Sequence, residues 1–263
     1  MLSNLYASFV NLDHRPDRLA HMTEQIKRVN LPITRTRGIP WKEVQAKSED
    51  IDVMLKRTPG AIGCHFSQMS VVREAYNQKK HALVMEDDII FCEDINLRLE
   101  YIDLWAEKNE WDVIWLGASF HVNPPFWHPV GYSKMSPNCS ANLGHDAKVT
   151  DDPHMIRTYG AFCTFAYIVN YKSMDKIFAL FDRHLRTSIG IDWLYIKLQP
   201  QLKCFSFVPG CVRQMDNRSD IGNGDTIWSG FLKLNGTYEN SAYVYQENMT
   251  DFDPTKFNWA EAW

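Results

Sequence analysis

Three adjacent carboxylates are the residues of this chain whose types and spacing point most clearly to chemistry. Glu86, Asp87 and Asp88 follow directly after the apolar segment 82–85. Neighbouring carboxylates repel one another unless a cation compensates them. If the middle side chain turns away, the outer two can aim at one point. A hard divalent ion such as Mn²⁺ or Mg²⁺ takes oxygen ligands there and can bridge to a diphosphate. The alternative is a solvated turn or the acid-rich start of a helix.

Two arginines form a basic turn after the first apolar segment, 5–12. Arg15 and Arg18 can hold phosphate oxygens in bidentate geometry, which lysine does poorly. Asp17 lies between them and can cap the helix expected after the turn. The alternative is a surface cluster of ion pairs in which these arginines bind Asp13 and Asp17.

Apolar periodicity predicts the elements that must position both groups. Short apolar segments indicate strands, and apolar residues at helical spacing indicate helices. The two kinds alternate, which predicts an α/β fold with a mostly parallel sheet. Ligands of such sheets bind at the carboxyl ends of the strands. The expected strands are 5–12, 33–38, 82–85, 113–116, 162–170 and 204–208, and the expected helices are 18–29, 63–78, 96–107, 173–185 and 192–198.

Two regions fit neither pattern. Residues 118–157 are rich in Pro, His, Asn and Ser, and we expect a long loop, which in a compact domain is usually functional or mobile. The end of the chain is polar, aromatic and rich in Gly and Asn. We therefore expect one domain over 1–222 that contains the loop, and an extension over 223–263 that packs on it. The sequence does not indicate an oligomeric state.

The composition excludes several classes of protein. The 263 residues include 28 Lys and Arg against 32 Asp and Glu, a formal net charge of −4, whereas nucleic-acid binders usually carry a basic excess. No apolar segment approaches the roughly 18 residues of a membrane span, and the first residues lack the basic region of a signal peptide. The six cysteines form no C-x-x-C pair. We expect a cytoplasmic protein with reduced thiols, no membrane span and no nucleic-acid partner.

Three motifs lie in a specific order along the chain. They are Val10-Asn11-Leu12-Asp13-x-Arg15-x-Asp17-Arg18, Gly60-x-x-Gly63-Cys64-x-x-Ser67 and Val84-x-Glu86-Asp87-Asp88, and further segments follow at 111–117, 166–169, 191–194 and 214–221. This set resembles glycosyltransferase family 25, which includes lipopolysaccharide galactosyltransferases and collagen hydroxylysine galactosyltransferases. The resemblance covers about residues 5–222, and the ordered set is more specific than the acidic triplet alone.

The resemblance implies a single GT-A-type Rossmann-like domain that binds a UDP-sugar, with galactose as the expected sugar, and Mn²⁺ or Mg²⁺. The implied acceptor is a glycan or a hydroxylated peptide. Carried over to this chain, Glu86 and Asp88 would bind the metal and the diphosphate. The implied donor-binding residues are Asn11, Arg15, Arg18, Gly63, Ser67 and Asp87, with Asp87 at the ribose or the sugar and Gly63 allowing close backbone approach. The alternative for Gly63 is a glycine at a helix start.

Members of the family invert the anomeric carbon, which requires a base to take the proton of the acceptor hydroxyl. Asp192 is the first candidate for this base, and Asp220 is the second, as a base or as a further metal or donor contact. The alternatives are a helix cap for Asp192 and a polar turn for Asp220.

One departure from the family keeps a second class of function open. The family usually has Ser-His where this chain has Ser67-Gln68. The leading hypothesis is a metal-dependent, inverting glycosyltransferase of the lipopolysaccharide-biosynthesis type. The alternative is a non-catalytic relative that only binds, which the intact acidic triplet disfavours and Gln68 slightly favours. A metal-dependent phosphoryl hydrolase is weaker, because it leaves the basic turn unexplained.

Overall fold

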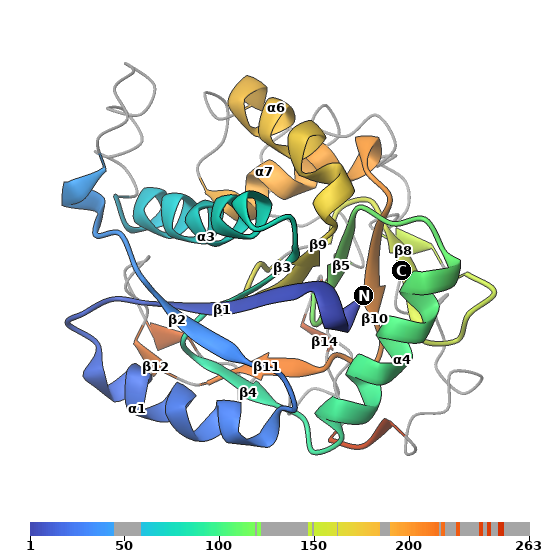
Figure 1. Cartoon of the computed structure of the whole chain (residues 1–263), viewed down its shortest axis with the longest axis horizontal. Coiled ribbons are helices and arrows are strands. Elements are labelled where there is room, and N and C mark those ends of the chain that lie inside the picture. Colours follow the sequence, from blue (N-terminus) through green and yellow to red (C-terminus); the bar gives the residue numbers. More distant parts are fainter. Residues whose placement is uncertain are drawn as a thin grey trace.

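A computed structural model describes residues 1–44, 59–118, 120–121, 147–148, 150–161, 163–184, 190–215, 217–218, 225–226, 237–238, 241–242 and 247–249. At its centre lies an eight-stranded sheet in the order β2-β1-β3-β9-β5-β10-β8-β7 (Figure 1). Its strands are β1 (Leu5–Asn11), β2 (Ile33–Arg37), β3 (His81–Met85), β5 (Val113–Trp115), β7 (Ala147–Lys148), β8 (Met155–Thr158), β9 (Ala166–Val169) and β10 (Cys204–Phe207).

Strands β8 and β9 run opposite to the other six, so the sheet is mostly parallel, as predicted. Helices cover both faces, which gives the chain a Rossmann-like α/β fold and confirms the predicted class. The α-helices are α1 (Pro16–Gln25), α3 (Pro59–Asn77), α4 (Ile95–Lys108), α6 (Met174–His184) and α7 (Ile191–Leu198). Short 3₁₀ turns are η1 (Leu2–Asn4), η2 (Ile26–Arg28), η3 (Trp41–Glu43), η4 (Tyr171–Ser173) and η6 (Gln199–Gln201).

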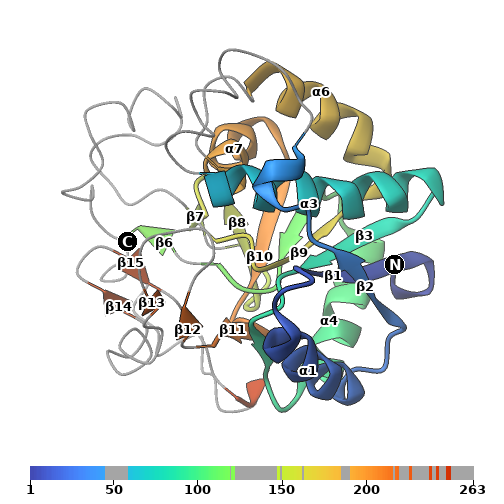
Figure 2. The ribbon, with the colours of Figure 1, turned by 90° about the vertical axis from the view of Figure 1, so that its left-hand side faces the viewer.

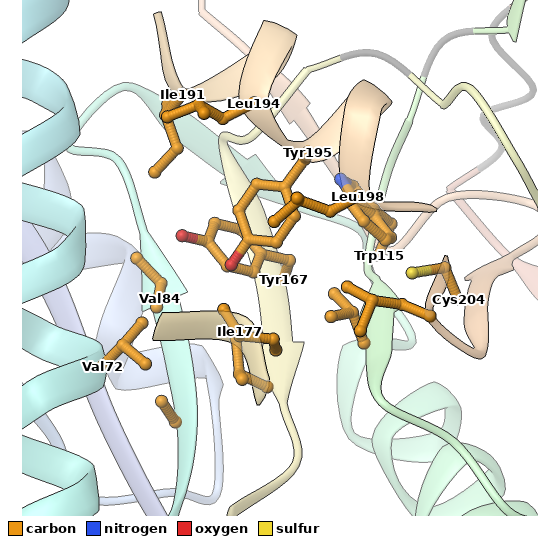
Figure 3. Packing of buried hydrophobic residues seen from close by; sticks show 14 of the residues in the cluster. Val72, Val84, Trp115, Tyr167, Ile177, Ile191, Leu194, Tyr195, Leu198 and Cys204 are labelled. Carbon is orange, nitrogen blue, oxygen red and sulfur yellow. The ribbon is translucent and has the colours of Figure 1, made fainter. Parts of the chain in front are cut away.

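The two faces of the sheet bury two separate apolar cores. Helices α3, α6 and α7 lie on one face and α1 and α4 on the other (Figure 1). Beneath α7, the ring of Tyr195 meets those of Trp115 and Tyr167, with centroids 5.4 and 5.1 Å away (Figure 3). All three side chains are fully buried. Each such ring pair stabilises the fold by about 0.5–1.5 kcal/mol beyond the burial of its surface area. The packing on this face therefore helps to hold the strands in position.

The first three strands bring the two predicted motifs to one edge. Strand β1 pairs in parallel with both β2 and β3, with Phe9 opposite Met85, so both chains leave the sheet at the same edge. The basic turn follows β1 and the acidic triplet follows β3. Figure 2 faces this edge of the sheet.

Short antiparallel pairs lie beside the main sheet. Strand β4 (Ile89–Phe91) begins directly after the acidic triplet and pairs with β11 (Val212–Gln214). The other pairs are β12 (Asn217–Arg218) with β13 (Asp225–Thr226), and β14 (Thr237–Tyr238) with β15 (Ser241–Ala242), which also pairs with β6 (Phe120–His121). The sequence analysis predicted none of them, because two or three residues show no periodicity.

Several predicted boundaries need correction. The predicted loop 118–157 includes most of β8, a strand of the central sheet. The predicted strand 162–170 narrows to β9. Helix α1 begins at Pro16 rather than at residue 18. The ring of proline fixes φ at a helical value, and its missing N–H would have no partner within the helix at this position. The division of the chain into 1–222 and 223–263 stays a prediction.

Two further expectations concern the described residues alone. Among the described residues, no disulfide joins the cysteines, which are Cys64, Cys92, Cys163, Cys204 and Cys211. Across the described part of the chain, no helix combines the length and the apolar character that crossing a bilayer requires.

Candidate functional site

The acidic triplet is held in place by main-chain hydrogen bonds at the end of β3. The amide of Glu86 donates to the carbonyl of Phe165 at 2.8 Å, and the amide of Met215 donates to the carbonyl of Asp88 at 2.7 Å. The first bond ties the triplet to the chain before β9, and the second ties it to the end of β11. The backbone of the triplet is therefore fixed on both sides, and its side chains have defined directions.

Asp87 is bound by Asn11, the last residue of β1, and by Arg18 of the basic turn. Asn11 donates from Nδ2 to its Oδ2 at 2.7 Å, and Arg18 donates from Nη1 to its Oδ1 at 2.8 Å. Arg18 also pairs with Oδ2 of Asp88 at 3.2 Å. All four side chains are buried. The structure thus brings Asn11, Arg18, Asp87 and Asp88 together, and both oxygens of Asp87 are engaged by the chain itself.

Arg15 has a different environment from Arg18. Its guanidinium donates to both oxygens of Asp17, at 3.0 and 2.8 Å, and Asp17 is exposed. This bond lowers the pKa of Asp17 to about 2. Asp13 pairs with Arg35 and Arg37 of β2. For Arg15, the surface ion pair that the sequence left open is therefore present.

Glu86 lies between two glutamine amides. Gln68 donates from Nε2 to Oε1 at 2.9 Å, and Gln214 donates from Nε2 to Oε2 at 3.1 Å. Burial is the largest cause that raises the pKa of Glu86 well above its usual range, followed by the charges of Asp88 and Asp192. Glu86 keeps part of its surface open to a cavity. The site therefore concentrates negative charge where water is scarce.

The outer carboxylates share one hydrogen-bond donor, the amide of Gln214. Nε2 of Gln214 lies 3.1 Å from Oε2 of Glu86 and 3.3 Å from Oδ1 of Asp88. Among the described residues, no group of three or more His, Cys, Asp and Glu side chains could hold a metal ion. Mg²⁺ commonly needs only one or two carboxylates, with substrate phosphates and water supplying the rest. Two converging carboxylates fit such an ion, and its presence stays a prediction.

A cavity of about 450 Å³ opens beside the triplet. Its polar lining includes Arg18, Cys64 and the three acidic residues. Its apolar lining residues are Val10, Leu12, Ile39, Pro40 and Trp41. Trp41 is 41% exposed, although large hydrophobic side chains are usually buried. Among the described residues, the lining includes Arg18 but not Arg15.

Gly63 and Ser67 lie in α3 and join it to the chain that follows β2. A Cβ atom on Gly63 would lie 2.7 Å from the carbonyl oxygen of Ile39, so only glycine allows this approach. Ser67 accepts a hydrogen bond from the amide of Ile39 at 2.7 Å and donates to the carbonyl of Gly63 at 2.6 Å. Both residues line the cavity and shape its wall. Their contact with a donor stays a prediction.

Asp192 lies in the first turn of α7, next to the acidic site. Its Oδ1 accepts a hydrogen bond from the hydroxyl of Thr164 at 2.6 Å. Burial raises the pKa of Asp192, and the bonds from Thr164 oppose this effect. The charge of Asp192 contributes to the raised pKa values of Cys64 and Glu86, both of which line the cavity. The second base candidate, Asp220, lies outside the described residues.

The sequence analysis assigned no site contact to four side chains. Gln68 and Gln214 bind Glu86, Thr164 binds Asp192, and Arg35 donates to Oδ1 of Asn11 at 3.0 Å. Two signals were visible: Gln68 stands where the family usually has histidine, and Gln214 opens one of the segments that resemble the family. No local pattern marks Thr164 or Arg35, since their partners lie in other elements.

The comparison with known families agrees with this geometry. The model of a family described as glycosyltransferase family 25 (LPS biosynthesis protein) matches residues 7–192, more than half of the chain. The matched range includes the basic turn, the acidic triplet and Asp192. No individually curated protein matches the chain.

Proposed function

Because the chain belongs to glycosyltransferase family 25, we propose that it transfers a sugar, with galactose as the first candidate, from a UDP-sugar to a glycan or hydroxylated-peptide acceptor. The observation that carries this proposal is the convergence of Glu86 and Asp88 on one point beside the cavity. We further propose that the reaction depends on Mn²⁺ or Mg²⁺ and inverts the anomeric carbon. The GT-A assignment belongs to the same proposal.

The proposed donor lies in the cavity, with its nucleoside on Trp41 and its diphosphate toward the acidic residues. Trp41 offers an exposed ring in the cavity wall, and planar rings stack well on such surfaces. Glu86 and Asp88 would hold the divalent ion, which when bound neutralises charge on the leaving diphosphate. Arg18 holds Asp87 and Asp88 in place, so its role is to position this end of the site.

Asp192 is the proposed base. In the proposed step its carboxylate takes the proton of the acceptor hydroxyl, and the acceptor oxygen forms a bond to the anomeric carbon. The bond from that carbon to the phosphate oxygen breaks, and UDP leaves with the electron pair. A buried carboxylate with a raised pKa is a stronger base than an exposed one. Thr164 fixes the direction of this carboxylate through its 2.6 Å hydrogen bond.

Calorimetric titration of UDP tests the donor site. We expect binding that requires Mn²⁺ and is lost in Asp88→Ala. Glu24→Ala is the matched control, because Glu24 is an exposed carboxylate of α1 that pairs with Lys27 of η2. UDP binding of unchanged strength without metal, or in Asp88→Ala with Mn²⁺, would refute the donor-site proposal.

A screen of several UDP-sugars with Mn²⁺, in which the release of UDP is measured, separates an enzyme from a binding module. Gln68 in place of the usual histidine is the observation that keeps the second candidate in view. UDP binding without turnover of any donor, in the presence of candidate acceptors, would favour the non-catalytic module.

A further inference from the structure

Gln68 carries a buried hydrogen-bond acceptor without a partner. Its side chain is fully buried in α3 and is one of those that line the cavity. Its Nε2 donates to Oε1 of Glu86 at 2.9 Å and to Sγ of Cys64 at 3.4 Å. Among the described residues, its Oε1 has no hydrogen-bond partner. Buried polar atoms are nearly always paired, and an unpaired one costs free energy, so this oxygen is expected to receive a donor from a ligand.

The direction of the Gln68 amide is fixed by its neighbours. With Glu86 ionised, as a bound cation would hold it, exchanging the oxygen and nitrogen would set Oε1 against a carboxylate oxygen, and two acceptors that face each other repel. The amide nitrogen therefore stays on Glu86, and the oxygen stays available. The missing partner must be a hydrogen-bond donor.

The position of Gln68 separates its oxygen from the proposed metal point. That point lies at Oε2 of Glu86 and Oδ1 of Asp88, where Gln214 donates. Gln68 binds the other oxygen of Glu86, Oε1, on the side of Cys64. The start of α7, which carries Asp192, packs on α3 one turn before Cys64, because a Cβ on Gly190 would lie 3.6 Å from Cβ of Ala61, so the proposed base is on this side as well. Between diphosphate and base lies the transferred sugar, whose hydroxyls are donors.

We propose that Oε1 of Gln68 accepts a hydrogen bond from a ring hydroxyl of the donor sugar, and that Gln68 thereby helps to select the sugar. This inference rests on the proposed function and adds a specificity-determining residue to it. It explains what an amide offers at this position: Nε2 holds Glu86 while Oε1 reads the substrate. A pocket that accepts a hydrogen bond from a hydroxyl disfavours an epimer whose hydroxyl points elsewhere, because the acceptor is then left unpaired.

The test compares UDP with UDP-sugars in calorimetric titrations with Mn²⁺. The probes are UDP, UDP-galactose, UDP-glucose and UDP-N-acetylglucosamine. Gln68→Met keeps the length of the side chain and removes both polar atoms. Gln68→Lys keeps N–H donors that can serve Glu86 and has no hydrogen-bond acceptor. Gln78→Met is the control, because Gln78 is an exposed residue that binds Glu74 at the end of α3.

We expect UDP affinity to stay within about two-fold in Gln78→Met. Both Gln68 variants alter the bond to Glu86, so their readout is the affinity for each UDP-sugar relative to UDP. The affinity for the preferred UDP-sugar relative to UDP should fall about three-fold to ten-fold in both Gln68 variants, the range for one neutral hydrogen bond. The preference among the three sugars should shrink by the same factor. Urea unfolding of each variant shows that the comparison concerns folded protein.

The alternative outcomes are distinct. If Gln68→Lys behaves like the natural chain while Gln68→Met does not, the bond to Glu86 is what matters, and the sugar contact is refuted. An equal loss of UDP and UDP-sugar affinity places the effect at the diphosphate and also refutes it. Unchanged binding of every probe refutes the inference alone. A natural chain that binds neither UDP nor any UDP-sugar refutes the proposed function, and the inference fails with it.

Discussion

Replacing Arg18 with methionine tests whether the basic turn holds the acidic triplet from within the protein. The Arg18 side chain is 9% exposed, and its partners Asp87 and Asp88 are 9% and 5% exposed. Methionine has a similar length and no charge, so it leaves both carboxylates buried without their cation. Removing one partner of a buried ion pair costs about 3–5 kcal/mol. We expect Arg18→Met to lower the free energy of unfolding by this amount.

Arg15→Met is the matched control, because it removes the same charge three residues away. Arg15 pairs with Asp17, whose side chain is 61% exposed, so water can solvate that carboxylate once the arginine is gone. Exposed pairs contribute about 0–1 kcal/mol. The two arginines look equivalent in the sequence, yet the expected losses differ several-fold.

The assay is urea unfolding at pH 7 in metal-free buffer, monitored by circular dichroism. A second variant, Arg18→Met with Asp87→Asn, should recover part of the loss, because one uncompensated charge is gone while Asn11 keeps an acceptor. Equal losses below about 1 kcal/mol for Arg18→Met and Arg15→Met would refute the reasoning. The absence of any recovery in the double variant would show that the cost of Arg18→Met comes from lost packing rather than from charge.

Three further predictions follow from the same site. Glu86→Gln should stabilise the metal-free chain more at pH 8 than at pH 5, measured by urea unfolding. The raised pKa of Glu86 means that the folded chain holds a proton that the unfolded chain has lost. The stability that Glu86 contributes is therefore full below its unfolded pKa and is lost as pH rises through its folded pKa. Asp192→Asn should abolish sugar transfer and leave UDP affinity within a few-fold by calorimetry, and retained turnover would exclude Asp192 as the base. Gly63→Ala should lower the melting temperature, because its Cβ would lie 2.7 Å from the carbonyl oxygen of Ile39, whereas Gly190→Ala, with 3.6 Å to the nearest atom, should change it little.

The parts of the site that follow long periodic elements could be predicted from the sequence. The apolar segments before Asn11 and Glu86 are strands, and their parallel pairing brings both motifs to one edge. Arg18 is separable from Arg15 by spacing, although the sequence analysis treated them alike. Pro16 fixes the start of α1, and Arg18 and Met22, four residues apart, share its buried face.

The parts that depend on distant pairing could not be predicted. Gln214 reaches the triplet because β11 pairs with β4, which sets Gln214 opposite Ile89 across more than a hundred residues. Both strands have three residues, too few for a pattern to appear. The bond between Thr164 and Asp192 likewise joins the chain before β9 to α7. Each contact arises from tertiary pairing, whose partners no single segment encodes.

The balance of charge at the site gives a physical reason for the proposed dependence on metal. The charges of Asp88 and Asp192 add to the burial that raises the pKa of Glu86. The guanidinium of Arg18 is already paired with Asp87 and Asp88. A diphosphate that binds beside these carboxylates brings further negative charge to Glu86. A divalent cation between Glu86 and Asp88 would relieve that repulsion and attract the diphosphate at once, so cation and donor should bind with positive coupling rather than independently.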